Sequence, residues 1–364
     1  MYETALPPLF EGEPSRKAWE EGRRQEILTL LSDQVYGFAP GPDQYKIRFE
    51  QIGQEDFKGI ATRRMVEATL HTAREDFRFR FVVFLPHGVA RPLPLALMIC
   101  IRVLDRPMDV EHLHEIPSWP VEDILARGYA TAGFYTQDIA LDREDGYFEG
   151  ILKSFEGDRE NRPANAWGAI AAWSFAASRV MDYLQTLPEV DPARIAVAGL
   201  SRGGKAALWC AASDTRFACV DSNESGCTGA AITRGKQGEH VKEINTTFPY
   251  WFCKNYKAYN EREDEMPFDQ HMLLSLIAPR LLYVSSASED SWADPEAEYR
   301  GAYEAGAVYA LYGLKGLEQR QMPGIDQPCH ENAVGYHLRA GEHDMTPHDW
   351  AFFMDFLDRH WAKD

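Results

Sequence analysis

A serine flanked by glycines is the feature of this sequence that points most directly to a reaction. Residues 195–205 read Ile-Ala-Val-Ala-Gly-Leu-Ser-Arg-Gly-Gly-Lys and contain the G-x-S-x-G pattern around Ser201. An apolar strand pattern precedes the serine and a helical pattern follows it, which is the setting of a nucleophile on a strained strand-to-helix turn. The next backbone N–H, that of Arg202, then points at a developing oxyanion. An ordinary glycine-rich turn is the alternative, and we predict that Ser201 is a nucleophile.

A serine nucleophile needs a base, and hydrolases with this turn place a histidine after it in the chain. Seven histidines follow Ser201: His240, His271, His330, His337, His343, His348 and His360. His343 lies just before Thr346-Pro347, a pair suited to cap and begin the last helix. Because the base normally stands on a loop before that helix, we predict His343 as the base.

Two carboxylates are candidates for the group that orients the base. Asp290 follows the apolar segment Leu281–Val284, where a hydrolase places its acid after the penultimate strand. Glu224 follows the strand pattern that comes after the nucleophile helix. Both loops open at the same end of a parallel sheet, so either carboxylate can reach the imidazole. The residues alone leave the choice open, and the constellation implies no metal or organic cofactor.

The elements that must position these residues read as an α/β domain. Partial or strict alternation in 45–51, 65–71 and 77–81 predicts antiparallel strands at the start of the sheet. Buried strands then alternate with helices, which predicts a mainly parallel sheet covered on both faces. The strands are expected at 95–101, 129–134, 195–198, 218–220 and 280–284, and the helices at 166–185, 202–212 and 346–361.

We expect residues 1–364 to form a single catalytic domain. Residues 1–40 read as a helical approach, with a helix over 16–31. Residues 140–165 and 226–267 are rich in glycine and charge, and we expect them to form loops or small insertions over the active-site face.

Charge and composition narrow the classes of partner. The formal net charge is −18, and a surface that negative repels nucleic-acid backbones and anionic lipids. No apolar run approaches the roughly 18 residues of a membrane span, and no signal-peptide core is present near Met1. We expect a cytoplasmic protein on the sequence as given, or a secreted or periplasmic one if a leader was removed.

The six cysteines lack CxxC spacing and are expected to be free thiols.

Several motifs in order resemble one known family. They are 162–168 (RPANAWG), 199–205 (GLSRGGK), 222–227 (SNESGC), 248–253 (FPYWFC), 273–280 (LLSLIAPR) and 288–295 (SEDSWADP). Together they resemble the bacterial glucuronoyl esterases of carbohydrate esterase family fifteen, from about Val35 to the C-terminus. Fungal members have paired cysteines where this chain has Leu200 and Asp344, so the resemblance is to the bacterial branch.

The resemblance implies an α/β-hydrolase fold, a three-layer α/β/α sandwich, and roles for individual residues. Ser201 corresponds to the nucleophile and His343 to the base. The acid stands at the position of Glu224 in some members and of Asp290 in others, and Asp290 is slightly favoured because a sugar-contacting tryptophan, here Trp292, follows it by two residues. Arg202 corresponds to an arginine of the oxyanion hole.

Three residues are expected to contact the acyl sugar. Lys205 corresponds to a lysine that binds sugar hydroxyls, and its i, i+4 spacing from Ser201 places both on one side of a helix. Trp292 offers an apolar ring face to a sugar. For an acidic residue that binds sugar hydroxyls we choose Glu239 over Glu243.

The resulting expectation is a serine esterase that cleaves esters of (4-O-methyl-)glucuronic acid, as in links between lignin and xylan. The substrate would be a small or oligosaccharide uronate ester, and we expect the chain to act as a monomer. One alternative is an acetylxylan esterase, or an acetyl esterase acting on another carbohydrate, with the same triad. An alternative of another class is an inactive carbohydrate-binding relative.

Overall fold

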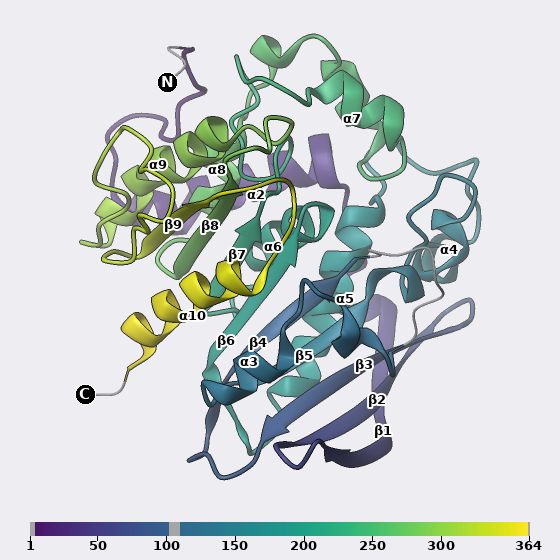
Figure 1. Cartoon of the computed structure of the whole chain (residues 1–364). Helices are drawn as coiled ribbons and strands as arrows, with labels where there is room; N and C mark the ends of the chain where they lie inside the picture. The colour runs from purple at the N-terminus through teal and green to yellow at the C-terminus, as the bar shows by residue number, and fades with distance from the viewer. Residues whose placement is uncertain (1–3, 102–109, 363–364) are drawn as a thin grey trace.

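A nine-stranded sheet runs through the molecule in the order β1-β2-β3-β5-β4-β6-β7-β8-β9 (Figure 1). The computed structural model describes residues 4–101 and 110–362. Strands β1 to β3 pair antiparallel, β3 pairs antiparallel with β5, and the pairs from β5 to β9 are parallel. The strands are β1 (Tyr45–Phe57), β2 (Ala61–Thr72), β3 (Asp76–Pro86), β4 (Leu93–Cys100), β5 (Ala130–Tyr135), β6 (Val190–Leu200), β7 (Cys219–Asn223), β8 (Leu281–Ala287) and β9 (Val334–Arg339).

Helices cover both faces of this sheet, as the uninterrupted apolar strands require. In β6, Ile195 and Val197 pack into one core, and Ala196 and Ala198 pack into the other. The first core includes residues of α2 (Arg24–Leu31), α5 (Ala169–Leu184), α6 (Arg202–Ser213), α8 (Gln270–Ser275) and α9 (Pro295–Leu311). The second includes residues of α3 (Val121–Ala126) and α10 (Pro347–Trp361), which lie on the near side of the sheet in Figure 1. The predicted α/β fold class, with antiparallel strands at its start, is confirmed.

The individual elements differ from the predictions mainly in length. Strands β1 and β2 run several residues beyond the expected segments, because their exposed faces carry polar side chains that hide the alternation. The first helix continues as α1 (Arg16–Ala18), a π-helical turn (Trp19–Arg23), α2 and a second π-helical turn (Ser32–Tyr36). It ends at Gly37, whose φ of 82° suits glycine. Helix α9 was not predicted.

The two segments expected as insertions carry short helices within irregular chain. Helix α4 (Ile151–Glu156) lies in the first, and α7 (Val241–Thr247) lies in the second. Figure 1 shows α7 above the ends of the central strands. Segment 248–253, which follows α7, hydrogen-bonds the start of α5 through the amides of Ala169 and Ile170.

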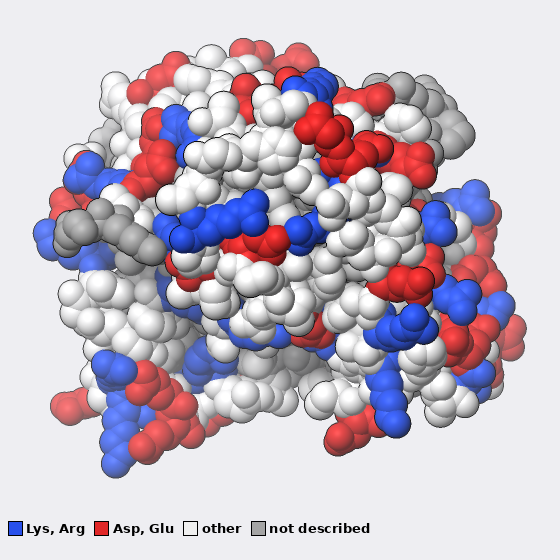
Figure 2. Space-filling model, turned by 90° about the horizontal axis from the view of Figure 1, so that it is seen from below, with Lys and Arg blue, Asp and Glu red and all other residues white. Residues whose placement is uncertain are grey.

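All six cysteines are free, as predicted. Among the helices in the described part of the chain, none combines the length and apolarity needed to cross a bilayer. On the face shown in Figure 2, acidic and basic side chains lie interspersed around uncharged patches, so the net negative charge does not form one continuous field there.

Candidate active site

Four neighbouring strands each deliver one polar residue to the same end of the sheet. Ser201 follows β6, Glu224 follows β7, Asp290 lies three residues beyond β8, and His343 stands on the loop between β9 and α10. The Ser201 amide donates to the carbonyl of Asn223 at 2.8 Å, and the Glu224 amide donates to that of Ser285 at 2.7 Å. Because parallel strands end at one edge, residues far apart in the chain meet there.

Ser201 occupies a strained backbone conformation, with φ 57° and ψ −122°. Its neighbours allow the strain: a Cβ on Gly199 would lie 2.3 Å from both the carbonyl carbon and oxygen of Gly203. Helix α6 starts at the next residue, so Ser201 stands at a helix N-terminus, where backbone N–H groups favour negative charge. This is the turn expected of a G-x-S-x-G nucleophile.

The imidazole of His343 contacts both candidate carboxylates through one nitrogen. Its Nδ1 lies 2.6 Å from Oδ2 of Asp290 and 3.2 Å from Oε2 of Glu224. Burial disfavours the charged imidazole, but the hydrogen bonds and charges of the two carboxylates outweigh it and raise the pKa of His343 to about 9. Both carboxylates are buried, whereas the His343 side chain is 44% exposed. The structure therefore brings both acids to the same imidazole.

The two acids differ in what else they bind. Burial opposes ionisation of Asp290, but the hydrogen bond and charge of His343 hold its pKa below the ordinary value. For Glu224 burial prevails and raises the pKa to about 7, although Arg339 and His343 favour the charged form. Arg339 donates to Oε1 of Glu224 at 2.7 Å, and the Asp344 amide donates to Oε2 at 2.9 Å. Glu224 is thus shared among three donors.

Arg339, at the end of β9, joins Glu224 to the loop that carries the histidine. Its guanidinium also donates to the carbonyls of Glu342 and Asp344 at 2.7 and 2.6 Å, and its Nε lies 2.9 Å from a carboxylate oxygen of Asp349. Asp349 accepts from the Thr346 amide at the start of α10. The buried arginine therefore fixes both ends of the His343 loop.

The side chain of Arg202, the residue after Ser201, is held by one carboxylate and by aromatic rings. Its guanidinium forms an ion pair with Asp142, and Asp142 also accepts from Tyr250 Oη at 2.8 Å and Trp251 Nε1 at 2.7 Å. The guanidinium carbon lies 5.2 and 4.9 Å from the ring centres of Phe248 and Trp251. Its buried Nε has no hydrogen-bond partner among the residues the structure describes.

Lys205 and Glu239 lie together on the other side of the cleft. The Nζ of Lys205 donates to the carbonyl of Ser225 and lies 3.9 Å from Oε2 of Glu239. Burial lowers the pKa of Lys205, and the charge of Glu239 opposes that shift. The side chain of Trp292 is exposed, and its carbonyl accepts from the Glu239 amide at 3.0 Å. A buried cation, a carboxylate and an open aromatic ring suit a polar ring-shaped ligand.

All eight residues singled out in the sequence line one cleft of about 340 Å³. They are Ser201, Arg202, Lys205, Glu224, Glu239, Asp290, Trp292 and His343. Sequence reasoning gave no role to Asp142, Arg339, Phe248 or Trp251. A signal existed for Arg339, a lone charge at the end of an otherwise uncharged strand, but Asp142 is one of many acids in a charged segment.

The same acids and histidine could be considered as metal ligands, because their ligand atoms lie within 4.8 Å of one another. The contacts favour a hydrogen-bonded arrangement instead. The Nδ1 of His343 bonds directly to Asp290, and the cationic Arg339 already occupies one oxygen of Glu224. A second positive charge beside Arg339 would be repelled.

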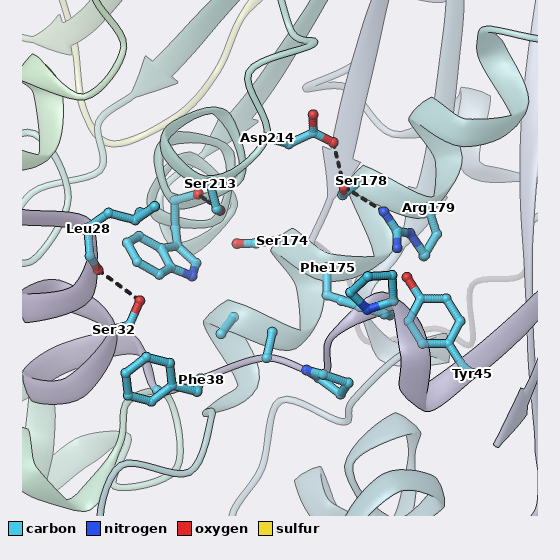
Figure 3. Close-up of a pocket in the computed structure, with 16 residues that line it drawn as sticks. Leu28, Ser32, Phe38, Tyr45, Ser174, Phe175, Ser178, Arg179, Ser213 and Asp214 are labelled. Carbon is cyan, nitrogen blue, oxygen red and sulfur yellow. Dashed lines mark hydrogen bonds between the residues drawn. The ribbon is translucent and has the colours of Figure 1, made fainter. Parts of the chain in front are cut away.

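A second pocket, of about 420 Å³, lies between the chain around Phe38 and the outer surfaces of α5 and α6 (Figure 3). The hydroxyls that line it are bound internally: Ser32 donates to the carbonyl of Leu28, and Ser178 donates to Asp214. No histidine lines this pocket within the described residues, so no serine there has a base. The chemistry therefore concentrates in the smaller cleft around Ser201.

Comparisons with known proteins identify relatives of the whole chain. Residues 116–313 match the family model described as "Glucuronyl esterase, fungi". A carbohydrate esterase from an unknown prokaryotic organism is 33% identical over 95% of this chain and 86% of its own. A 4-O-methyl-glucuronoyl methylesterase from Wolfiporia cocos is 33% identical over 85% of this chain and 71% of its own. A solved glucuronoyl esterase from Solibacter usitatus is 38% identical, with a TM-score of 0.90 and 99% of both chains covered.

Proposed function

This chain belongs to the glucuronoyl esterase family, and we propose that it hydrolyses esters of glucuronic acid or its 4-O-methyl derivative through Ser201 and His343. The observation that carries the proposal is the cleft itself. It joins a serine on a strained turn, a histidine bound to two carboxylates, and a sugar-sized recess with a buried lysine. Membership of the family makes the chain a carboxylic ester hydrolase.

The proposed reaction is acyl transfer in two halves. With Nδ1 bound to Asp290, the other ring nitrogen of His343 takes the proton of Ser201 as the serine oxygen attacks the ester carbonyl. Collapse of the tetrahedral intermediate breaks the bond to the alcohol, which leaves with that proton. Water, deprotonated by His343, then attacks the acyl-enzyme and releases the uronic acid and Ser201.

The charge that develops on the carbonyl oxygen is proposed to meet Arg202. Its backbone N–H lies in the first turn of α6, and its side chain lines the cleft and is 30% exposed. Donors held in place before the reaction stabilise an oxyanion without reorganisation. Asp142 and the two rings under the guanidinium keep the side chain from turning away.

The acyl sugar is proposed to lie between Lys205, Glu239 and Trp292. Lysine and glutamate supply a hydrogen-bond donor and an acceptor for ring hydroxyls, and the exposed indole supplies an apolar face. An acetyl group has no hydroxyls for Lys205 and Glu239 and no ring for Trp292, so this part of the cleft supports a uronate over an acetyl ester.

The test is hydrolysis of benzyl glucuronate beside an acetylated sugar, with the wild type and Ser201→Ala. We expect preference for the glucuronate, and a loss of at least about 10³-fold in the variant, as triad deletions cause elsewhere. Thr29→Ala, a change on the partly exposed surface of α2, controls for differences in expression and purification between variants. Preference for the acetyl ester would retain the triad and refute the substrate, and no turnover would favour a sugar-binding relative.

A further inference from the structure

A third cavity, of about 390 Å³, lies beside the active-site cleft and has no part in the proposed reaction. It is formed by the chain around α4 and by residues 249–257, which follow α7 (Figure 1). We call it the basic pocket, defined by Tyr147, Arg159, Tyr250, Lys254 and Lys257.

The basic pocket gathers cations that lack acidic partners. Arg159, Lys254 and Lys257 line it, and none has a carboxylate within the 4.0 Å ion-pair distance among the described residues. Glu144 and Glu160 also line the pocket, so its cations outnumber its anions. In a chain with 38 basic and 56 acidic residues, such a local excess of unpaired cations concentrates an anionic ligand.

A fourth cation of the pocket is occupied within the protein. Arg162 forms an ion pair with Glu156 and donates to the carbonyl of Trp167. This buried arginine therefore holds the pocket wall, while Arg159, Lys254 and Lys257 remain for a ligand.

Two stacked tyrosines form the aromatic part of the pocket lining. Tyr147 and Tyr250 stack with their centres 5.3 Å apart and their planes at 27°, and Arg159 lies 5.2 Å from the centre of the Tyr147 ring. Both tyrosines are buried, so they form a rigid backing for the cations and not an open ring face. Cations held over such a backing suit a ligand with a carboxylate, and a uronic acid carries one.

The basic pocket shares a wall with the active site. Tyr250 lines the pocket, and its hydroxyl donates at 2.8 Å to Asp142, the residue that holds Arg202. A ligand that contacts Tyr250 in the pocket is therefore separated by Asp142 from Arg202, the arginine proposed to face the reacting carbonyl.

We propose that the basic pocket binds a second uronic acid residue, with its carboxylate at Arg159, Lys254 and Lys257. This rests on the proposed function, because it adds a subsite to an enzyme of uronate esters. The second uronate has two possible sources, a further residue of the same substrate chain or a free sugar acid such as the product.

The test uses the variant Lys254→Glu/Lys257→Glu, with Lys17→Glu/Lys46→Glu as a control that changes the net charge equally at exposed sites away from both cavities. Each is assayed on benzyl glucuronate and on an oligosaccharide that carries one uronate ester and one free uronate. We expect kcat/KM for the oligosaccharide to fall about tenfold in the pocket variant, through KM, and to change little in the control. Activity on benzyl glucuronate should be unchanged in both.

Free glucuronate distinguishes the two sources. If the pocket accepts free glucuronate, added glucuronate should inhibit oligosaccharide turnover by the wild type but not by the pocket variant. If only uronate within the substrate chain binds, glucuronate should affect both proteins alike, while the pocket variant still shows the lower kcat/KM for the oligosaccharide. Equal losses in the pocket and control variants, or no loss in either, would overturn the proposal. Calorimetric binding of the oligosaccharide to Ser201→Ala, with and without the lysine changes, tests the pocket independently of turnover, so failure of the esterase function is recognised separately.

Discussion

At the scale of single residues, the central feature is one imidazole nitrogen bound to two unequal acids. Asp290 lies closer to Nδ1 of His343, at 2.6 Å, and its low pKa keeps it ionised. Glu224, at 3.2 Å, also accepts from Arg339 and from the Asp344 amide. We infer that Asp290 orients the base, and that Glu224 mainly holds the loop on which the base stands.

The two acids can be separated by their pH profiles. Asp290→Asn removes the charge that raises the pKa of His343 above its ordinary value, so that pKa should fall by about one unit or more. Since the base must be neutral to accept a proton, the rise of kcat/KM with pH should move to lower pH in this variant. The plateau rate should fall by less than in Ser201→Ala, because Glu224 can still accept from Nδ1.

Glu224→Gln is the matched variant for this measurement. It keeps the shape of the side chain but removes one of the two carboxylate charges that balance Arg339, so its main effect should be a lower Tm. A profile that shifts more in Glu224→Gln than in Asp290→Asn would reverse the assignment of the two acids.

The sequence was informative about residues whose roles follow from position along the chain. Ser201, His343 and both acids come after strands or before a helix, and such positions are readable from local pattern. Arg339 contacts Glu224 across 115 positions and Asp142 contacts Arg202 across 60, and no local pattern encodes such contacts. Hence the residues that line the cleft were predicted from the sequence, whereas the buried ion pairs that hold them required the structure.

At the scale of elements, the turn between β6 and α6 depends on close approach of backbone to backbone. A Cβ added at Gly199 would meet main-chain atoms and not a movable side chain. The strained backbone of Ser201 therefore persists only while the glycines on either side let the strand and helix close.

Gly199→Ala should break this turn. We expect a loss of about 2 kcal/mol or more in the free energy of unfolding, from forced overpacking, or roughly 3 °C in Tm for a chain of this length, together with loss of esterase activity. Gly22→Ala is the control, because an added Cβ there meets only the end of the Glu26 side chain at 3.8 Å. Equal thermal stability of the two variants would show that the turn tolerates a side chain.

Element boundaries followed most closely from the sequence where burial is two-sided, as in β4 and β5. Helix α9 was missed because its glycines lower helical propensity, and one of them has a reason visible only in the fold. A Cβ on Gly301 would lie 2.1 Å from the carbonyl oxygen of Ala230, so this helix packs directly against the segment that follows Glu224.

At the scale of the whole molecule, a third buried carboxylate stands behind the two acids. Glu298 of α9 accepts from the Gly226 amide at 2.8 Å and from the Ser286 hydroxyl at 2.7 Å. Burial, helped by the charges of Asp290 and Glu224, raises its pKa from 4.5 to about 8. The folded protein therefore binds a proton that the unfolded chain releases over this range.

This proton makes stability depend on pH with a definite sign. Between about pH 4.5 and 8 the folded state holds more protons at Glu298 than the unfolded chain, so its contribution to stability falls as pH rises. Glu298→Gln should lack the part of the pH dependence that comes from this carboxyl group. Tm measured from pH 5.5 to 8.5 should decline more steeply in the wild type, with exposed Glu13→Gln as the control. Parallel curves for all three proteins would contradict the assignment.

Strand β9 is the last strand of the sheet, and the loop after it carries His343. One edge of β9 pairs with β8, and the other pairs with the short irregular segment around Cys329 through its bridge to Tyr336. The step proposed to need the base is thereby tied to a margin of the sheet, while Ser201 stands near its middle. Local unfolding of β9 and the loop after it would abolish turnover before the remaining strands separate. Turnover should therefore be lost before any probe of bulk secondary structure changes. The contacts of Arg339 determine how much disturbance the loop tolerates before turnover falls.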